Sequence, residues 1–297
     1  MTDDFFRKAP STFASYNITQ DQIDTLEACV NGKTTPEDAA AVLTAYPEAS
    51  PTPLEMQQRL GGLWTLLNDT AVGIMSAQSK IIAILQVIRT LPRIEEPKGE
   101  GEDYINLDDG FVWRELSGWA IDWADNYNRM GASIRDLNFT PADRNMLDYA
   151  ARFTIDPSQG QERAARKQAW ISANAYTARL ALTSDVALTS YGAALERARY
   201  VIKRALEREG DDTEPDDLEA AAQLFIYAAP ELYRPSTDTT TNMPSKDNVW
   251  NDRRGCYMGR WDFWMDRWAS LAREEGFSTE VRTAADEAFK AMQRVES

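Results

Sequence analysis

Apolar residues recur at intervals of three and four along almost the whole chain, a spacing that puts them on one face of an α-helix. The longest such stretch runs from Leu54 to Leu91. No segment alternates apolar and polar residues as a half-buried strand does, and no long-period repeat is found. A chain of 297 residues can also bury a large core. The pattern predicts an all-α protein, a single globular domain over residues 1–297 with about nine to eleven helices.

Capping and breaking residues indicate where these helices begin and end. Thr19 is placed as the N-cap of a helix over 20–30, and Thr35-Pro36 opens a second helix that we expect to stop at Pro47. The stretch from Leu54 to Leu91 is expected to kink or divide at Gly61-Gly62 or at Asn68-Asp69. Further helices are expected over 111–134, from Thr140, and over 161–183, 186–209, 216–233 and 279–295.

Two polar stretches interrupt the helical pattern, an acidic exposed loop over 92–110 and a polar loop over 236–247. Between Glu95 and Asp109 there are seven acidic residues against Lys98 alone. The whole chain carries a net charge of −15 and has a pI near 4.6. This balance argues against nucleic acid or an anionic membrane surface as a partner.

Large side chains are most concentrated between Trp250 and Leu271, where four of the nine tryptophans are interleaved with arginines and aspartates. Trp261, Trp264 and Trp268 share one face of a helix. Two interpretations stay open: the rings form core, or they wall a ligand pocket in which an arginine clamps a carboxylate or phosphate. The candidate ligand-binding residues are Arg253, Arg254, Tyr257, Arg260 and Trp261.

A second stripe runs beside the apolar face of the predicted helix over 111–134. Its members are Glu115, Gly118, Asp122, Asn126 and Arg129. If the stripe faces a cleft, Glu115 and Asp122 are the candidate catalytic acid and base, with Trp119 and Trp123 as ligand-binding neighbours. Gly118 would open space there. The alternative is a solvated helix face.

Histidine is absent, which excludes Ser-His and Cys-His nucleophile pairs and every zinc or iron site that contains histidine. Acid–base chemistry must then use Asp, Glu, Tyr, Lys or Cys. The two cysteines, Cys29 and Cys256, lie far apart and are expected to be buried thiols. Neither a P-loop nor a dinucleotide-binding glycine motif is present, so we expect no cofactor and no metal site.

The N-terminal residues open with acids and lack the apolar core of a secretory signal. No run of apolar residues approaches the roughly 18 that a membrane span needs. The expected location is therefore the cytoplasm, and we expect no association with a membrane.

Three segments resemble a known family. LEAAAQLFIYAAPELY (Leu218–Tyr233), followed by a loop and GRWDFWMDRWASL (Gly259–Leu271), resembles the tryptophan-rich C-terminal signature of a family of filamentous-fungal proteins catalogued as a domain of unknown function. The Pro-Glu-Asp-Ala-Ala start at Pro36 is similar to the N-terminal region of that family. The resemblance implies a fungal, intracellular, all-α protein. It implies no reaction and transfers no catalytic residues.

Three functions are compatible with these features. The first is a metal-free small-molecule-binding protein or enzyme of fungal specialised metabolism, which would use carboxylates, arginine and an aromatic-lined pocket for a cyclisation, isomerisation or dehydration. The alternative is a helical scaffold or regulator that binds a protein partner or forms a homo-oligomer. A minor alternative is a divergent helical terpenoid synthase, because Asp211-Asp212 and Asp216-Asp217 resemble an aspartate-rich metal motif.

Overall fold

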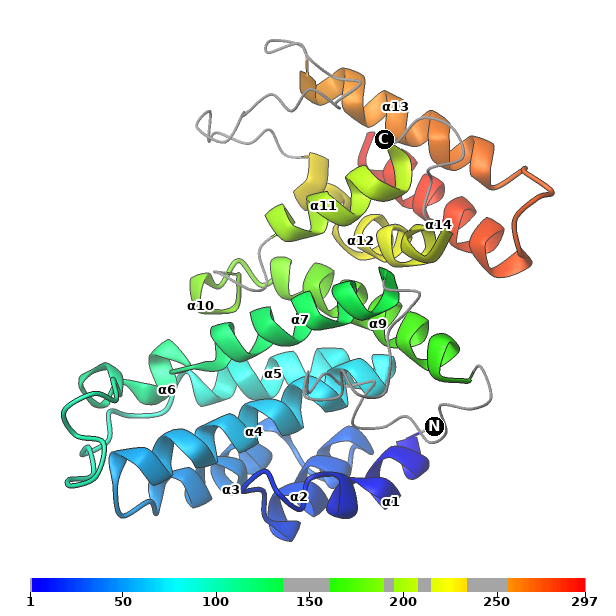
Figure 1. Ribbon diagram of the computed structural model, residues 1–297. Helices are drawn as coiled ribbons and strands as arrows, with labels where there is room; N and C mark the ends of the chain where they lie inside the picture. The colour runs from blue at the N-terminus through cyan, green and yellow to red at the C-terminus, as the bar shows by residue number, and fades with distance from the viewer. Residues whose placement is uncertain (1, 136–160, 190–194, 208–214, 234–255, 297) are drawn as a thin grey trace. The chain divides into compact units, whose positions relative to one another are not determined.

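The computed structural model describes residues 2–135, 161–189, 195–207, 215–233 and 256–296, and these residues contain α-helices, 3-10 turns and loops but no strand (Figure 1). Within them, 11 helices are seven residues or longer. The all-α fold class is confirmed. The predicted helix from Thr140 and the polar loop over 236–247 lie outside the described residues.

The helices keep the labels of Figure 1. They are α1 (Thr2–Thr12), α2 (Gln20–Val30), α3 (Pro36–Glu48), α4 (Pro53–Gly73), α5 (Gln78–Ile88), α6 (Val112–Glu115), α7 (Trp119–Arg135), α9 (Gln161–Ala181), α10 (Val186–Thr189), α11 (Leu195–Leu206), α12 (Pro215–Tyr233), α13 (Cys256–Leu271) and α14 (Thr279–Glu296). Two 3-10 turns are η1 (Met75–Ala77) and η2 (Asp108–Gly110).

Contacts divide the chain into two compact units. The first comprises Met1–Ser172 with Asp185–Ala193, and the second comprises Ala173–Ser184 with Ala194–Ser297. The boundary therefore falls inside α9. The single domain expected over 1–297 stays a prediction.

In the first unit, threonines start three successive helices. Thr19, Thr35 and Thr52 have extended backbones, and each hydroxyl accepts a hydrogen bond from the backbone N–H three residues later. These bonds satisfy amides that a helix start leaves without partners. The predicted starts at Thr19 and Thr35 are confirmed. The second helix does not stop at Pro47, however, because Pro47 lies inside α3, which ends at Glu48.

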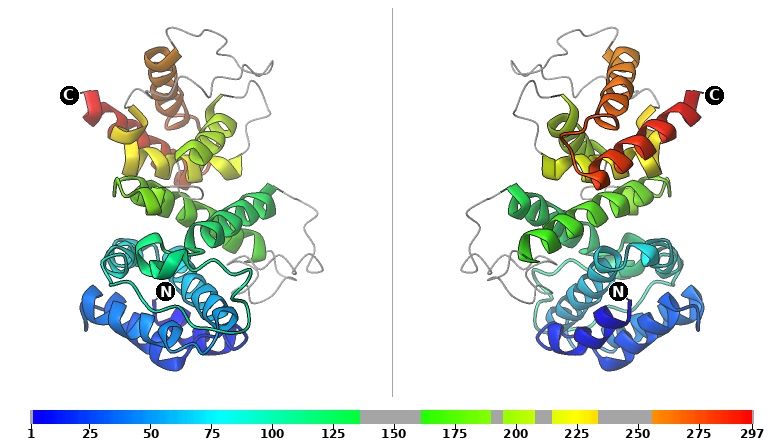
Figure 2. Two further views of the ribbon diagram at one scale, coloured as in Figure 1. Left: turned by 90° about the vertical axis from the view of Figure 1, so that its left-hand side faces the viewer. Right: turned by 90° about the vertical axis from the view of Figure 1, so that its right-hand side faces the viewer.

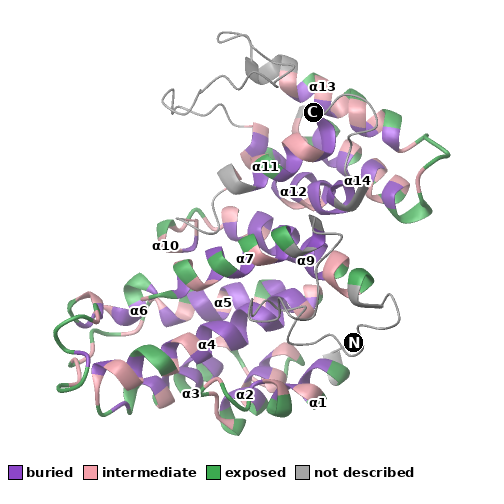
Figure 3. Cartoon of the chain, in the orientation of Figure 1, coloured by how far each residue is buried: buried purple, intermediate pink, exposed green. Residues whose placement is uncertain are grey.

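The core of the first unit forms where α3 packs on α2, α4 and α5, and where α4 packs on α7. Figure 3 shows α4 and α5 as largely buried. From Gly62 to Val72 every residue of α4 is buried, polar ones included. A helix buried on all sides has no solvated face, which explains the long apolar run in the sequence.

The predicted kink of the Leu54–Leu91 stretch is misplaced. The stretch breaks at Ile74 (φ −129°, ψ 83°), not at Gly61-Gly62 or Asn68-Asp69. Gln78 bridges the break, since its Nε2 donates to the carbonyls of Ala71 at 3.0 Å and Ser172 at 2.9 Å. Within the described residues no single helix is long and apolar enough to cross a membrane, although α4 and Met75–Ile88, bent by 116°, meet that test as a pair.

The predicted continuous helix over 111–134 is also wrong. It divides into α6 and α7 because Leu116 (φ 51°) and Gly118 (φ 83°) adopt left-handed conformations, which a helix interior excludes. The divided chain lets the carbonyl of Ser117 accept a hydrogen bond from the Trp64 indole at 2.8 Å. Glu115 and Asp122 therefore lie on different helices.

Two further differences concern α1 and the segment of α10 and α11. Helix α1 was not predicted, although it buries Phe5, Phe6 and Ala9. The helix expected over 186–209 is described as α10 and α11, with residues 190–194 outside the described part.

In the second unit, α12 packs on α11 and α14, and α13 packs on α14. Figures 1 and 2 show α12 (yellow) beside α14 (red). Both helices bury alanines at their contact faces, and side chains this small let two helices approach closely. Pro230 lies inside α12, and the backbone leaves the helical conformation two residues before it, at Ala228 (φ −127°).

Candidate functional site

A cleft of about 580 Å³ is formed within the first unit by α4, the segment before α6 and the start of α7. Its size falls in the range of small-molecule sites. The lining residues are Gln57, Leu60, Gly61, Trp64, Asn106, Leu107, Asp108, Ser117, Gly118, Ile121, Asp122 and Asp125. Three of the twelve are aspartates and four carry large apolar side chains.

The apolar part of the lining comes from three segments. Leu60 and Trp64 of α4 and Leu107 of the loop are buried, whereas Ile121 of α7 is 60% exposed. The Trp64 indole N–H is already bound to the carbonyl of Ser117. Trp64 therefore offers the cleft no hydrogen-bond donor, and its ring, 1% exposed, lies just beneath the lining.

Two glycines keep the cleft open. A β-carbon at Gly61 would meet no atom within 4 Å. Gly118 has φ +83°, and a β-carbon there would lie 3.9 Å from the Trp64 indole nitrogen. A side chain at Gly61 would enter free space at no cost to the backbone, while one at Gly118 would be strained.

Asp122 is held in the cleft by buried amides. Its Oδ2 accepts hydrogen bonds from Asn68 Nδ2 of α4 at 2.8 Å and from Asn126 Nδ2, one turn along α7, at 3.2 Å. Asn68 is itself oriented, because its Oδ1 accepts a bond from the Trp119 indole at 3.1 Å. Asn68 and Asn126 are both buried, so these connected hydrogen bonds fix the direction of the Asp122 carboxylate.

Asp108 comes from a strained turn. Asp108, Asp109 and Gly110 have successive φ values of 57°, 53° and 79°, a left-handed run that costs the two aspartates about 1 kcal/mol each or more. The backbone of Gly110 pairs with Ile94, whose N–H donates to the Gly110 carbonyl at 2.9 Å. A β-carbon at Gly110 would lie 2.3 Å from the Ile94 carbonyl, so only glycine fits.

The carboxylate of Asp108 is held by neutral donors. The Ser117 hydroxyl donates to its Oδ2 through a short hydrogen bond, and Asn106 Nδ2 donates to its Oδ1 at 3.3 Å. The third aspartate, Asp125, is exposed, and its Oδ2 lies 3.9 Å from the Nη2 of Arg129 on the same helix. Among the described residues, no three acidic or thiol side chains form a group that could hold a metal ion.

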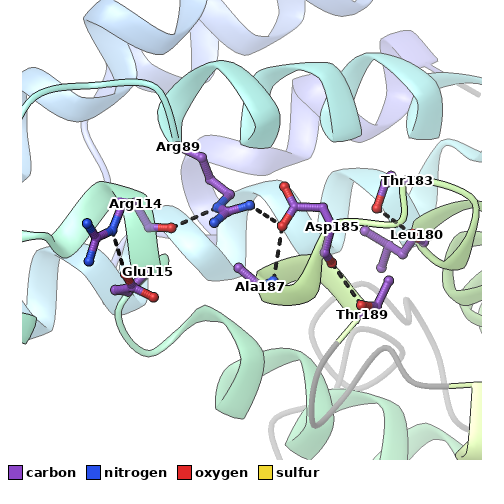
Figure 4. Close-up of polar contacts among 8 residues, drawn as sticks. All are labelled: Arg89, Arg114, Glu115, Leu180, Thr183, Asp185, Ala187 and Thr189. Carbon is purple, nitrogen blue, oxygen red and sulfur yellow. Dashed lines mark hydrogen bonds and ion pairs between the residues drawn. The ribbon is translucent and has the colours of Figure 1, made fainter.

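Of the predicted catalytic pair, the structure places only Asp122 in the cleft. Glu115 is exposed on α6 and accepts a hydrogen bond from Arg114 Nε at 2.6 Å (Figure 4). The Arg114 guanidinium also lies over the Phe111 ring. Arg89 connects α6 to α10 by donating to the Arg114 carbonyl at 2.7 Å and pairing with Asp185 (Figure 4). The two carboxylates predicted to work together are thus not brought together.

The predicted ligand-binding tryptophans of α7 lie behind the cleft rather than in its wall. Trp119 and Trp123 are fully buried and neither lines the cleft. Trp119 acts on the cleft indirectly, through its bond to Asn68. Trp123 packs against Tyr127, with ring centroids 6.0 Å apart.

The second predicted set belongs to the second unit, where the tryptophans of α13 form core. Trp261, Trp264 and Trp268 are buried around Phe225 of α12, with ring centroids 5.5 to 6.1 Å from it. The Trp264 indole donates to the buried Glu207 carboxylate at 3.0 Å.

Arg260 is taken up by the same carboxylate. Its Nε lies 3.1 Å from Glu207 Oε1, and its guanidinium lies 5.8 Å from the Trp264 ring centroid. An arginine paired with a buried acid inside the fold is not placed to clamp a ligand. Arg253 and Arg254 lie outside the described residues, as do the side chains of Tyr257 and Cys256.

The aspartate-rich run is only partly described. Asp211 and Asp212 lie outside the described residues. Asp217 is 1% exposed and accepts a hydrogen bond from Arg204 Nε at 2.7 Å. Its carboxylate therefore serves the packing of α11 on α12.

Sequence reasoning missed most of the cleft. The sequence pattern places Asp108 in the acidic loop and Trp64 and Asn68 in an apolar helix, and it does not link the two segments. One signal was available: Asn68-Asp69 stands within a strongly apolar run, and buried polar groups are hydrogen-bonded. Asn68 and Asp69 do not kink α4, and Asn68 instead bonds to Asp122 and Trp119.

The fold and the site define a class of protein: an all-α chain with a small cleft lined by carboxylates and apolar side chains. A family model described as "Protein of unknown function (DUF3632)" matches residues 64–268, more than half of the chain, and the protein belongs to this family. The resemblance to a domain of unknown function is confirmed. The match includes Asp108, Ser117 and Asp122 of the cleft. No curated protein and no solved structure matches the chain.

Proposed function

We propose that this protein binds a small, partly apolar molecule in the cleft formed by α4, the segment before α6 and α7. The observation that carries the proposal is the cleft itself, about 580 Å³ in volume, whose lining combines oriented carboxylates with apolar side chains. Small-molecule sites share this composition of apolar surface with a few fixed polar groups. The buried amides behind Asp122 also hold it in one orientation before any ligand arrives, which lowers the cost of binding.

If the bound molecule reacts, we assign proton transfer to Asp122. An isomerisation, cyclisation or dehydration needs only groups that accept and return protons, and a carboxylate can do both. Glu115, the partner expected from the sequence, does not line the cleft. The second carboxylate is instead Asp108 or Asp125, because each of them lines the cleft with Asp122.

The setting that we propose is the cytoplasm of a filamentous fungus and its specialised metabolism. Both are supported by the resemblance of the α12 and α13 segments, which implies a fungal, intracellular protein. Both belong to the proposal and stand apart from the cleft.

Native mass spectrometry tests the binding role. The wild type, a Gly61→Trp variant and a Gly61→Ala variant are purified from the natural host and compared. The tryptophan side chain would fill the cleft from a position where a β-carbon meets nothing within 4 Å, whereas alanine leaves it open. We expect a small molecule to co-purify with the wild type and with Gly61→Ala but not with Gly61→Trp.

The result that would overturn the proposal is equally definite. If all three proteins carry no small molecule, and no member of a broad metabolite panel raises the melting temperature of the wild type, the cleft is not a binding site. A partner chain that co-purifies with all three would favour a helical scaffold or regulator.

A further inference from the structure

We propose that Arg93 and Arg114 form a second ligand site in the first unit, which binds a phosphate monoester group. This site is separate from the cleft and does not depend on the role proposed for it. Three features support it: the two guanidinium groups share one aromatic ring, contacts within the protein orient each of them, and their terminal nitrogens remain for a ligand. The sequence predicted an arginine clamp of this kind at Arg260, which is instead paired with Glu207.

Both guanidinium groups lie over the ring of Phe111. The Cζ of Arg114 is 4.0 Å from the ring centroid, and the Cζ of Arg93 is 5.6 Å from it. At these distances a guanidinium group is attracted by the π-electrons of the ring. The ring is half-buried, so it gives both side chains a fixed surface on which to pack. One ring thus brings two cations together in a chain whose net charge is −15.

The left-handed turn before α6 orients Arg93. The Nε of Arg93 donates a hydrogen bond to the Asp109 carbonyl at 2.6 Å. Its side chain also lies along Gly110, where a β-carbon would meet Arg93 Cγ and Nε at 3.2 Å. Neither contact uses the terminal nitrogens Nη1 and Nη2, which have no hydrogen-bond partner within the described residues. Their N–H groups are therefore left for a ligand.

Neighbouring residues hold Arg114 (Figure 4). Its Nε donates to Glu115 at 2.6 Å, and its carbonyl accepts a bond from Arg89 Nε at 2.7 Å. The terminal nitrogens of Arg114 also have no partner in the part of the chain that the structure describes. Glu115 partly neutralises Arg114, but the two side chains are 43% and 54% exposed. An ion pair this exposed is weak, so a ligand with more charge can compete with Glu115.

Two arginines favour a phosphate monoester over a carboxylate. Near neutral pH a phosphate monoester carries a charge of about −1.5 to −2 and has three acceptor oxygens. It can accept hydrogen bonds from two guanidinium groups at once, whereas the two oxygens of a carboxylate are satisfied by one. The net charge of the chain acts against any anion. Salt screens charges beyond about 8 Å at physiological ionic strength, however, so the local contacts determine the affinity.

The test compares three anions by isothermal titration with the full chain at constant ionic strength. Phenyl phosphate presents the phosphate group on a small molecule, and the N-acetyl amide of phosphoserine presents it on a phosphorylated side chain. Benzoate is the carboxylate control. We expect both phosphates to bind with a Kd of about 1 mM or lower, and benzoate to bind at least about fivefold more weakly. The tighter of the two phosphates indicates the source of the group.

Matched variants assign the binding to the two arginines. Arg93→Gln and Arg114→Gln should each weaken the binding of phenyl phosphate about tenfold. Arg114→Lys keeps the charge but loses the planar fork, and should weaken binding about threefold or more. Glu115→Gln removes the competing carboxylate and should tighten binding. Arg273→Gln changes an exposed arginine of the second unit and should leave binding unchanged. Circular dichroism establishes that each variant is folded.

Several outcomes overturn the proposal. If neither phosphate binds at millimolar concentration, or if Arg273→Gln weakens binding as much as Arg93→Gln and Arg114→Gln do, these arginines form no specific site. Equal affinity for benzoate would show that the site does not select phosphate. Gly61→Trp, which fills the cleft, should leave phosphate binding unchanged. Loss of phosphate binding in that variant would place the phosphate in the cleft rather than at Phe111.

Discussion

Neighbouring glycines of α4 have opposite surroundings, and their substitution separates helix propensity from packing. Gly61→Ala is expected to raise the free energy of unfolding by about 0.5–1 kcal/mol, because alanine loses less backbone entropy in a helix. Gly62→Ala is expected to lower it by about 1–3 kcal/mol, because the new β-carbon would lie 2.2 Å from the Tyr16 carbonyl oxygen. Urea denaturation followed by circular dichroism measures both. A Gly62→Ala variant as stable as Gly61→Ala would show that the Tyr16 backbone yields freely.

Cys29 allows a prediction about pH. Burial raises the pKa of its thiol. Since the thiolate is the reactive form, we expect Cys29 in a Cys256→Ser variant to react with a disulfide reagent at pH 8 much more slowly in the native than in the unfolded state.

The same shift in pKa has a consequence for stability. The unfolded thiol ionises near its ordinary pKa while the folded one stays protonated. The contribution is therefore complete below the ordinary pKa and is lost as the pH rises toward the folded value. The Cys256→Ser protein should lose stability above about pH 9 relative to Cys29→Ala in the same background. Equal labelling rates in the native and unfolded states would contradict both expectations.

At the scale of elements, the junction of α4 and α5 depends on Gln78. Its amide donates to the buried carbonyls of Ala71 and Ser172, and without it the Ala71 carbonyl keeps the longer bond from the Ser172 hydroxyl, at 3.3 Å. Gln78→Ala is expected to lower the free energy of unfolding by about 1–3 kcal/mol. Gln86→Ala, on the exposed side of α5, provides the matched control and should change it by less than about 0.5 kcal/mol. Similar effects of the two changes would mean that the junction is held by other contacts.

The elements that the sequence predicted well are those with local signals. Thr19, Thr35 and the apolar spacing of α12 determine their helices through nearest neighbours alone, so the pattern was sufficient. The misplaced breaks depend on tertiary contacts. Gly62 does not bend α4, because it is needed for the approach of Tyr16. Leu116 is a good helix former that nonetheless adopts φ 51°, next to a turn that the Trp64 indole binds.

Only the α7 side of the candidate site was predicted, again because sequence patterns report local neighbours and not tertiary contacts. Asp122 and Gly118 were found because they share a short helical stripe beside an apolar face. Asp108 and Trp64 lie more than forty residues apart in sequence and meet only in the folded unit. No spacing rule links a loop aspartate to a tryptophan of another helix, so periodicity alone could not assemble this cleft.

At the scale of the whole molecule, the division into two units raises the question of whether they unfold cooperatively. Gly62→Ala strains only the first unit. If the units open separately, hydrogen exchange should accelerate for the amides of α4 and α5 and remain unchanged for those of α12 and α14. Mass spectrometry of peptides from each unit measures this. Equal acceleration in both would show that the chain unfolds as the single domain expected from its sequence.

The burial of the tryptophans also determines the intrinsic fluorescence of the protein. Seven of the nine tryptophans are among the fully buried side chains: Trp64, Trp113, Trp119, Trp123, Trp170, Trp261 and Trp268. Native emission should therefore be shifted to short wavelength and should move to longer wavelength on unfolding. Trp64 is the one among these seven that lines the cleft. A ligand in the cleft would thus quench a small, distinct fraction of the emission, and replacing Trp64 with phenylalanine would remove that optical signal.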